Sequence, residues 1–215
     1  MRFEDLREEL VDQLQKDGIT DAVVLSAFRK ITREDFVLPH LREFAYRNQA
    51  LPINAKQTIS QPFIIALMMQ SMELKPTDVV LEVGTGSGYQ TALIAEIADK
   101  VCTVERHKEL TEEAKKKLTK KGYKNIFYKV GDGTTGWYGM YPPIKLFDKI
   151  VVCAAAPSIV QPLIDQLAVG GKLVIPVGSL ESQKLNIITK NEDGIDNKID
   201  IGCSFVPLIG EEGWD

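Results

Sequence analysis

Histidine and cysteine are scarce in this 215-residue chain, and their scarcity argues against several kinds of site. The three cysteines, Cys102, Cys153 and Cys203, are widely spaced in apolar, strand-like stretches. Such a set suggests neither a disulfide framework nor a zinc site, so we expect three buried thiols. The two histidines, His40 and His107, are too few for a histidine-based metal site, and they disfavour a Ser-His-Asp triad. We therefore expect no metal and no hydrolase chemistry.

Long apolar runs and an excess of positive charge are also missing. No apolar run approaches the 18 or so residues that a membrane span needs, and the opening MRFEDL lacks the apolar centre of a signal peptide. The formal net charge is −4, whereas proteins that bind the nucleic-acid backbone usually carry a clustered positive face. The lysines between 115 and 121 are typical of the solvated end of a helix. We expect a cytoplasmic protein that binds neither membrane nor nucleic acid.

The apolar pattern that is present indicates a single α/β domain over 1–215, with a helical N-terminal extension at 1–75, a core at 76–180 and C-terminal strands at 181–215. Apolar residues recur at helical spacing in 3–14 and 23–31, which predicts two amphipathic helices. Residues 33–62 have little periodicity and three prolines, so we expect a largely irregular segment followed by a helix at about 61–72.

From residue 78 onward, strand and helix patterns alternate. Strands are predicted near 79–83, 101–105, 126–130, 149–155 and 172–178. This alternation predicts a doubly wound, mostly parallel sheet of the Rossmann-like type. Segments 184–189 and 199–206 flank the turn NEDG at 191–194 without room for a helix, so we expect an antiparallel strand pair at the sheet edge.

The strongest motif is the run VVLEVGTGSGYQ at 79–90, which predicts a strand, a glycine turn and a helix start. One residue separates its second and third glycines, whereas the dinucleotide fingerprint has two, and the loop resembles that of S-adenosylmethionine methyltransferases. A Cβ at Gly84 or Gly86 would occupy the space where a ligand must lie. Glu105 ends the next predicted strand, where its carboxylate can accept hydrogen bonds from ribose hydroxyls. The motif indicates a nucleoside-cofactor site, and the alternative is a glycine-rich turn without a ligand.

Asp132 and Gly133 follow the third predicted strand, at the sheet edge where open α/β proteins bind ligands. The Asp132 carboxylate could accept the adenine amino group or begin an Asx turn, and the sequence leaves both open. The aromatic residues of the loop that follows, Trp137, Tyr138 and Tyr141, are equally open between packing and ligand cover.

Ser60 directly precedes the proline-containing first turn of the helix expected at about 61–72. The default interpretation is a helix N-cap, because a serine hydroxyl there accepts from orphan backbone N–H groups. The same position would let the hydroxyl meet an anionic substrate, since a helix N-terminus favours negative charge.

Seven segments together resemble the protein-L-isoaspartate (D-aspartate) O-methyltransferase family. They are ALPI at 50–53, QTISQP at 57–62, LEVGTGSGYQT at 81–91, VGDG at 130–133, AAAP at 154–157, GGKLVIPVG at 170–178 and FVPL at 205–208. They run in family order across nearly the whole chain, and QTIS, AAAP and PVG are its most specific parts.

The resemblance implies methyl transfer from S-adenosyl-L-methionine to the free α-carboxylate of L-isoaspartyl residues in damaged proteins and peptides. The products are S-adenosyl-L-homocysteine and an ester that reverts through a succinimide to aspartate. We expect a monomer that acts without metal. The implied cofactor-binding residues are Glu82, Gly84, Thr85, Gly86, Ser87, Gly88, Glu105, Asp132 and Gly133. The implied substrate-binding residues are Thr58, Ile59, Ser60, Val206, Pro207, Leu208 and Ile209, with Ser60 as the catalytic serine.

The chain departs from the family pattern at two positions, where Lys56 replaces an expected glycine and Asn48 an expected aspartate. The chemistry needs no strong base, because an α-carboxylate is already ionised at pH 7. Ser60 would therefore orient the substrate rather than deprotonate it. Two other functions remain open: a methyltransferase for a small molecule or RNA, although an RNA enzyme should be more basic, and a binding module without turnover.

Overall fold

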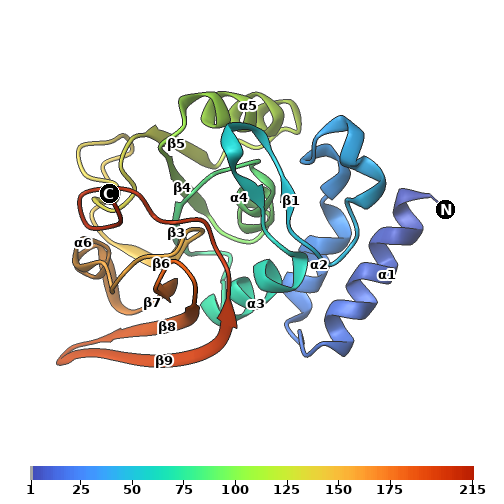
Figure 1. Cartoon of the computed structure of the whole chain (residues 1–215). Helices are drawn as coiled ribbons and strands as arrows, with labels where there is room; N and C mark the ends of the chain where they lie inside the picture. The colour runs from blue at the N-terminus through green and yellow to red at the C-terminus, as the bar shows by residue number, and fades with distance from the viewer. Residues whose placement is uncertain (1) are drawn as a thin grey trace.

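The computed structural model describes residues 2–215 and is built around a seven-stranded sheet with helices on both faces (Figure 1). The strand order is β5-β4-β3-β6-β7-β8-β9. The strands are β3 (Val79–Val83), β4 (Lys100–Glu105), β5 (Ile126–Val130), β6 (Phe147–Val152), β7 (Leu167–Gly178), β8 (Gln183–Asn191) and β9 (Gly194–Cys203). The pairs from β5 to β7 are parallel, whereas β8 pairs antiparallel with both β7 and β9. This is the doubly wound sheet with an antiparallel edge that the sequence predicts.

The chain reverses its direction of travel across the sheet between β3 and β6. From β3 it proceeds outward to β4 and β5, and then it returns to place β6 on the other side of β3. In open α/β sheets, ligands bind in the crevice outside the carboxyl ends of the strands at such a switch point. The glycine loop follows β3, and Cys153 follows β6, so these two segments border the crevice.

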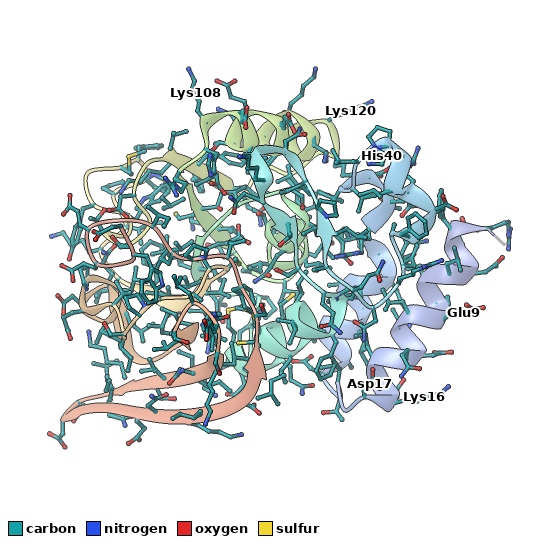
Figure 2. All side chains as sticks on the ribbon, in the orientation of Figure 1. Glu9, Lys16, Asp17, His40, Lys108 and Lys120 are labelled. Carbon is teal, nitrogen blue, oxygen red and sulfur yellow. The ribbon has the colours of Figure 1, made fainter. Side chains whose placement is uncertain are left out.

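Within residues 2–215, six α-helices surround the sheet or extend beside it: α1 (Phe3–Lys16), α2 (Ala22–Lys30), α3 (Pro62–Met72), α4 (Tyr89–Ala95), α5 (Lys108–Lys120) and α6 (Gln161–Asp165). The helices predicted in 3–14, 23–31 and about 61–72 are thus confirmed. Figure 1 shows α1 in blue at the outer side of α2, away from the sheet. In Figure 2, Lys108 and Lys120 point outward from α5. Lys120 is exposed, as predicted for the lysines between 115 and 121, whereas Lys117 is only partly exposed. Among residues 2–215, no helix combines the length and apolar character that crossing a membrane requires.

The segment before α3 is largely irregular, as expected. It contains three 3₁₀ turns, η1 (Arg33–Asp35), η2 (Pro39–Phe44) and η3 (Asn54–Lys56). Two short strands, β1 (Leu51–Pro52) and β2 (Thr58–Ile59), pair antiparallel around η3. We call residues 51–59 the β1–β2 hairpin.

The central strands are buried on both faces, which is why their sequences are nearly continuous β-branched runs rather than alternating ones. Val80 of β3 packs into the core formed with α1 to α5. Its neighbours Leu81 and Val83 face the other core, which includes Trp137 and residues of α6. The fold therefore has two apolar layers separated by the sheet.

Several strand boundaries differ from the prediction, most of all the starts of β7 and β9. β7 begins at Leu167 rather than near 172, because an irregularity in its pairing with β6 carries the strand through the two glycines at 170–171. β6 ends at Val152 rather than 155. β9 begins at Gly194 rather than 199 and ends at Cys203 rather than 206, so residues 204–206 lie outside it. There the chain turns toward the end of β6, where the Ala155 N–H donates to the Val206 carbonyl at 2.8 Å.

Candidate active site

A cleft opens at the carboxyl ends of β3, β4 and β6, and its volume is about 790 Å³ including its mouth. Its walls come from the glycine loop, the end of β4, the start of the segment after β6, the β1–β2 hairpin and residues 206–209. The lining residues are Gln57, Thr58, Ile59, Ser60, Ile65, Val83, Gly84, Thr85, Gly86, Ser87, Gln90, Val104, Glu105, Arg106, His107, Gly133, Cys153, Ala154, Val206, Pro207, Leu208 and Ile209.

The glycine loop has the backbone geometry that its sequence predicts. Gly84, Gly86 and Gly88 have φ values of +100°, +51° and +85°, a region that L side chains rarely adopt. A Cβ at Gly84 would stand 3.1 Å from the Cβ of Cys153. The loop thus passes close to the end of β6 and leaves room for a ligand above it. Gly88 serves another purpose, because a Cβ there would meet Ala114 of α5 at 3.1 Å, and Gly88 does not line the cleft.

Glu105 lies at the end of β4 with 6% of its surface exposed. One carboxylate oxygen, Oε2, accepts from the Gly86 N–H at 3.0 Å, and the other, Oε1, accepts from the His107 N–H at 3.0 Å. These bonds fix the carboxylate, and each oxygen keeps capacity for a further donor. The geometry suits two neighbouring hydroxyl groups of a ribose.

Glu82 lies beneath the loop rather than in the cleft wall. Its Oε2 accepts from the hydroxyls of Thr91 at 2.6 Å and Thr103 at 2.7 Å, and the Thr103 and Thr85 hydroxyls are 2.6 Å apart. Burial raises the pKa of Glu82 to about 7, and its Oε1 has no hydrogen-bond partner within the described residues. Because strand side chains alternate between faces, Glu82 points into the core and braces α4 and the loop instead of meeting the cleft.

Asp132 forms the Asx turn that was one of its two interpretations. Its Oδ1 accepts from both the N–H and the hydroxyl of Thr134 at 2.7 Å, and its Oδ2 accepts from the Glu211 N–H at 2.8 Å. Burial raises the pKa of Asp132, but these hydrogen bonds outweigh that effect and hold the pKa below its usual value. Gly133 lines the cleft and Asp132 does not. An adenine contact by Asp132 therefore stays a prediction, and it would involve an oxygen that already accepts a hydrogen bond.

The aromatic residues of the next loop do not line the cleft. Trp137 is 1% exposed and donates from Nε1 to the Pro142 carbonyl at 2.9 Å, so it serves packing. Tyr138 and Tyr141 are exposed to solvent.

Ser60 is not the N-cap of α3, so that default interpretation is wrong. The helix begins at Pro62, and its N-cap, Gln61, has no side-chain capping bond. Instead Asn48, distant in sequence, accepts from the Phe63 N–H at 3.0 Å through Oδ1. The Ser60 side chain is thereby left on the cleft wall.

A second cavity, which we call the outer groove, adjoins the cleft and has a volume of about 1220 Å³ including open space. Four residues line both cavities: Thr58, Ser60, Cys153 and Val206. The other groove residues are Ala50, Gln61, Ile64, Glu181, Ser182, Gln183, Gly202, Cys203, Ser204 and Phe205. Cys153 and Cys203 are thus only partly buried, and of the three thiols only Cys102 is buried as predicted.

Several wall residues were missed by sequence reasoning. His107, Gln57 and Cys153 line the cleft, and Gln183 accepts from the Phe205 N–H at 2.9 Å at the end of the outer groove. The two residues after Glu105 could have been included, because they continue from the same strand end. Nothing local in the sequence indicates Gln183, whose partner lies 22 residues away.

The departures at Lys56 and Asn48 have plain structural consequences. Lys56 adopts φ +56°, a left-handed conformation in which a glycine carries less strain. Asn48 retains the acceptor oxygen that an aspartate would supply to α3.

Comparison with known proteins agrees with this geometry. A family model described as protein-L-isoaspartate(D-aspartate) O-methyltransferase (PCMT) matches residues 5–213. The protein-L-isoaspartate O-methyltransferase of Petrotoga mobilis is 52% identical over the full length of both chains. That of Dictyoglomus turgidum is 47% identical, over 99% of this chain and 95% of the relative.

Two solved structures share the fold. One protein-L-isoaspartate O-methyltransferase superposes with a TM-score of 0.84 at 27% identity, covering 96% of this chain and 67% of that chain. A Plasmodium falciparum structure, described as a protein-L-isoaspartate O-methyltransferase in complex with S-adenosyl-L-homocysteine, has a TM-score of 0.81 at 26% identity, covering 94% and 98%. This chain belongs to the protein-L-isoaspartate (D-aspartate) O-methyltransferase family.

Proposed function

We propose that this protein is a repair methyltransferase that transfers a methyl group from S-adenosyl-L-methionine to the free α-carboxylate of L-isoaspartyl residues in damaged proteins and peptides. The ester then reverts through a succinimide to normal aspartate. Family membership supports the reaction class. The roles of the two cavities are assigned from the wall that they share. A group bound in the outer groove would meet the cleft at Ser60, which lines both cavities.

The cleft residues fit the nucleoside cofactor. Gly84 and Gly86 line the cleft without side chains of their own, and Glu105 presents two fixed carboxylate oxygens. We assign the glycine loop, including Thr85 and Ser87, to the methionine part, Glu105 to the ribose and Gly133 to the adenine side. When bound, the cofactor supplies an electrophilic methyl group on a sulfonium. Glu82 and Gly88 support this site from below and from the side.

The substrate is assigned to the outer groove and the shared wall. Thr58, Ile59 and Ser60 form one side, and the segment from Val206 to Ile209 forms the other. The isoaspartyl α-carboxylate has a reference pKa near 4, so it reaches the site ionised at pH 7 and needs no base. The Ser60 hydroxyl donates a hydrogen bond to it and orients one oxygen toward the cleft. We also propose that the enzyme acts as a monomer.

Alignment is the main contribution of the protein. Holding the carboxylate and the methyl donor in line can supply up to roughly 7 to 11 kcal/mol of the barrier. Attack of an anion on a cation neutralises charge, so a wall that excludes water favours reaction over solvated separation. Ile59 is buried on this wall, while Val206 is partly buried, and both give it apolar character.

Transfer of labelled methyl to paired peptides tests the reaction. The peptides are identical except that one contains L-isoaspartate and the other L-aspartate, and we expect label on the first alone. A chain that binds S-adenosyl-L-homocysteine yet labels neither peptide would have another acceptor or no turnover.

Ser60→Ala tests the catalytic assignment. We expect kcat to fall roughly tenfold or more, because the carboxylate loses an orienting hydrogen bond, while the Kd for S-adenosyl-L-homocysteine stays within about twofold. Stability should be unchanged, since the hydroxyl caps no helix. Ser26→Ala, at an exposed position of α2, is the matched control and should alter none of these quantities. An unchanged kcat for Ser60→Ala would remove Ser60 from the mechanism.

A further inference from the structure

Arg33 is a charged residue that is fully buried beside the active site. It begins the 3₁₀ turn η1 and has no exposed surface. Its Nε donates to the Ala45 carbonyl at 2.7 Å, and its Nη2 donates to the carbonyls of Ser60 at 3.1 Å and Gln49 at 3.4 Å. The guanidinium carbon lies 5.0 Å from the centre of the Tyr89 ring. Four separate segments of the chain therefore meet at one guanidinium.

Burying a charged guanidinium in this way costs more free energy than filling the same space with an apolar side chain. Burial lowers the pKa of Arg33 to about 10, which still leaves it cationic at pH 7. Its hydrogen-bond partners are carbonyl oxygens rather than a carboxylate, and its Nη1 is buried without a partner among the described residues. Burying an ion costs several kcal/mol even after relaxation, and an apolar side chain would avoid that cost. The guanidinium instead fixes the positions of these carbonyl groups.

The carbonyls mark both ends of the β1–β2 hairpin. Gln49 precedes the hairpin and Ser60 follows it, so one Nη2 group ties its two ends together. Tyr89, under the guanidinium face, is the first residue of α4 and directly follows Gly88 of the glycine loop. Arg33 thus connects the segment that carries Ser60 with the element that ends the glycine loop.

We propose that Arg33 is a positioning residue for methyl transfer: by holding the Ser60 carbonyl while resting on Tyr89, it sets the Ser60 hydroxyl against the glycine loop. This inference rests on the role of Ser60 in the proposed function. Arg33 itself touches neither cavity. It acts through the backbone of Ser60, so its loss should matter only while the Ser60 hydroxyl is present.

A double-mutant cycle of Arg33→Lys and Ser60→Ala tests this dependence, measured as kcat on the isoaspartyl peptide. Lysine keeps the charge but lacks the planar fork that holds several carbonyls at once. We expect Arg33→Lys alone to lower kcat roughly tenfold or more, because small misplacements near the reacting groups are costly. In the Ser60→Ala background the same change should lower kcat less than about twofold. The Kd for S-adenosyl-L-homocysteine, from calorimetry, should stay within about twofold throughout.

The matched control is Arg29→Lys on the surface of α2, where Arg29 pairs with Glu8, and it should leave kcat unchanged. If Arg33→Lys does not fold, by loss of cooperative urea unfolding, Tyr89→Leu replaces it in the cycle. That variant removes the ring under the guanidinium and leaves the three carbonyl bonds, and we expect a smaller loss of kcat with the same dependence on Ser60.

Additive losses in the cycle, or a parallel loss of cofactor affinity, would reduce Arg33 to a structural residue and overturn the proposal. An unaffected kcat in Ser60→Ala would overturn it as well, because no Ser60 role would then exist for Arg33 to set. Failure of the proposed function looks different: the wild-type chain would bind S-adenosyl-L-homocysteine and leave the isoaspartyl peptide unlabelled.

Discussion

Gly84 is the residue at which the glycine loop approaches the end of β6, and substitution there should separate strain from ligand fit. In Gly84→Ala the new Cβ would lie 3.1 Å from the Cβ of Cys153 at φ +100°. Gly122→Ala is the matched control, because Gly122 has φ +93° and no atom within 4 Å of the added Cβ. Both variants should lose about 1 to 2 kcal/mol of unfolding free energy from left-handed strain. Only Gly84→Ala should also bind S-adenosyl-L-homocysteine more weakly.

Urea unfolding and calorimetry give the two readouts for this pair. Equal cofactor affinity in both variants would mean that the cleft tolerates a Cβ at Gly84, and the site assigned to the methionine part would then lie elsewhere.

The raised pKa of Glu82 makes the stability of the protein depend on pH. Its folded pKa is about 7 against an ordinary value of 4.5, so between these values the folded state holds more protons than the unfolded one. Stability from this group is fully present below about pH 4.5 and is lost as pH rises through about 7. The loss is on the order of 3 kcal/mol. Glu82→Gln does not titrate and should remove this part of the pH dependence.

Urea unfolding at pH 5, 6, 7 and 8 measures the effect as the difference between variant and wild type. As pH rises, the unfolding free energy of Glu82→Gln should increase relative to that of the wild type. For Glu9→Gln, at an exposed site of α1 (Figure 2), the difference from the wild type should be the same at every pH. A constant difference for Glu82→Gln would mean that Glu82 is ionised in the folded protein well below pH 7.

At this scale the sequence predicts residues whose chemistry is local. Gly84 and Gly86 follow from the spacing of the loop, and Glu105 from its place at the end of the next strand. Glu82 was assigned to the cofactor, but strand alternation turns it away from the cleft. The Asx turn of Asp132 is local, through Thr134, but the second partner of this carboxylate, the Glu211 N–H, is 79 residues away, so no local pattern predicts that contact.

The N-terminus of α3 depends on a side chain from outside the helix. Asn48 accepts from the Phe63 N–H, and the N-cap residue itself contributes no side-chain bond. Asn48→Ala should therefore lower the unfolding free energy by about 1 kcal/mol, the usual loss of a cap. Asn48→Asp should raise it by about 0.3 to 1 kcal/mol at low ionic strength, because an anion at a helix N-terminus is favoured.

Urea unfolding at low and high salt measures both changes. The gain from Asn48→Asp should shrink at high salt, where the helix dipole is screened. An aspartate variant no more stable than the alanine variant would show that Asn48 does not cap α3 in solution. Ser60→Ala serves as the control here, since its hydroxyl does not cap this helix.

Helix α3 shows which features of a helix the local sequence predicts and which it does not. Its start at Pro62 was predicted to within a residue, because proline in the first turn is a local signal. The residue that caps the helix was not predicted, because Asn48 comes from the irregular segment and reaches α3 only in the folded chain. The end of β9 was predicted too late for a similar reason: Val206 bonds to Ala155, beyond the end of β6, instead of to β8.

Across the whole molecule, the site depends on contacts between segments that are far apart in the sequence. Alternating strands and helices predict the parallel sheet, and the switch point between β3 and β6 follows from its strand order. The outer groove has no such signature, because its walls come from the hairpin, the β7–β8 turn and the end of β9. Arg33 likewise has no motif, and its hydrogen-bond partners follow it by 12 to 27 residues.

The C-terminal segment packs against the cleft, and the contacts that hold it there should affect peptide binding more than cofactor binding. The Trp214 indole N–H donates to the Ala155 carbonyl at 3.0 Å, as does the Leu208 N–H at 2.8 Å, while Asp132 accepts from the Glu211 N–H. These bonds hold residues 206–209 against the cleft. Asp132→Ala should therefore speed amide hydrogen exchange in 208–214 and raise the peptide KM several-fold. Asp193→Ala, in the exposed β8–β9 turn, should do neither.

The contribution of Asp132 to stability changes with pH in the opposite direction to that of Glu82. The folded pKa of Asp132 is depressed, so its stabilisation is present above about pH 3.8 and is lost as pH falls through the folded value. A chain lacking residues 210–215 separates the two roles of this carboxylate, because it removes the Glu211 contact and leaves Asp132 and its Asx turn in place. An intact Kd for S-adenosyl-L-homocysteine in the shortened chain, with a lower affinity in Asp132→Ala, would indicate that Asp132 also contacts adenine. Equal affinity in both would confine Asp132 to holding the C-terminal segment, and slow exchange in Asp132→Ala would contradict even that role.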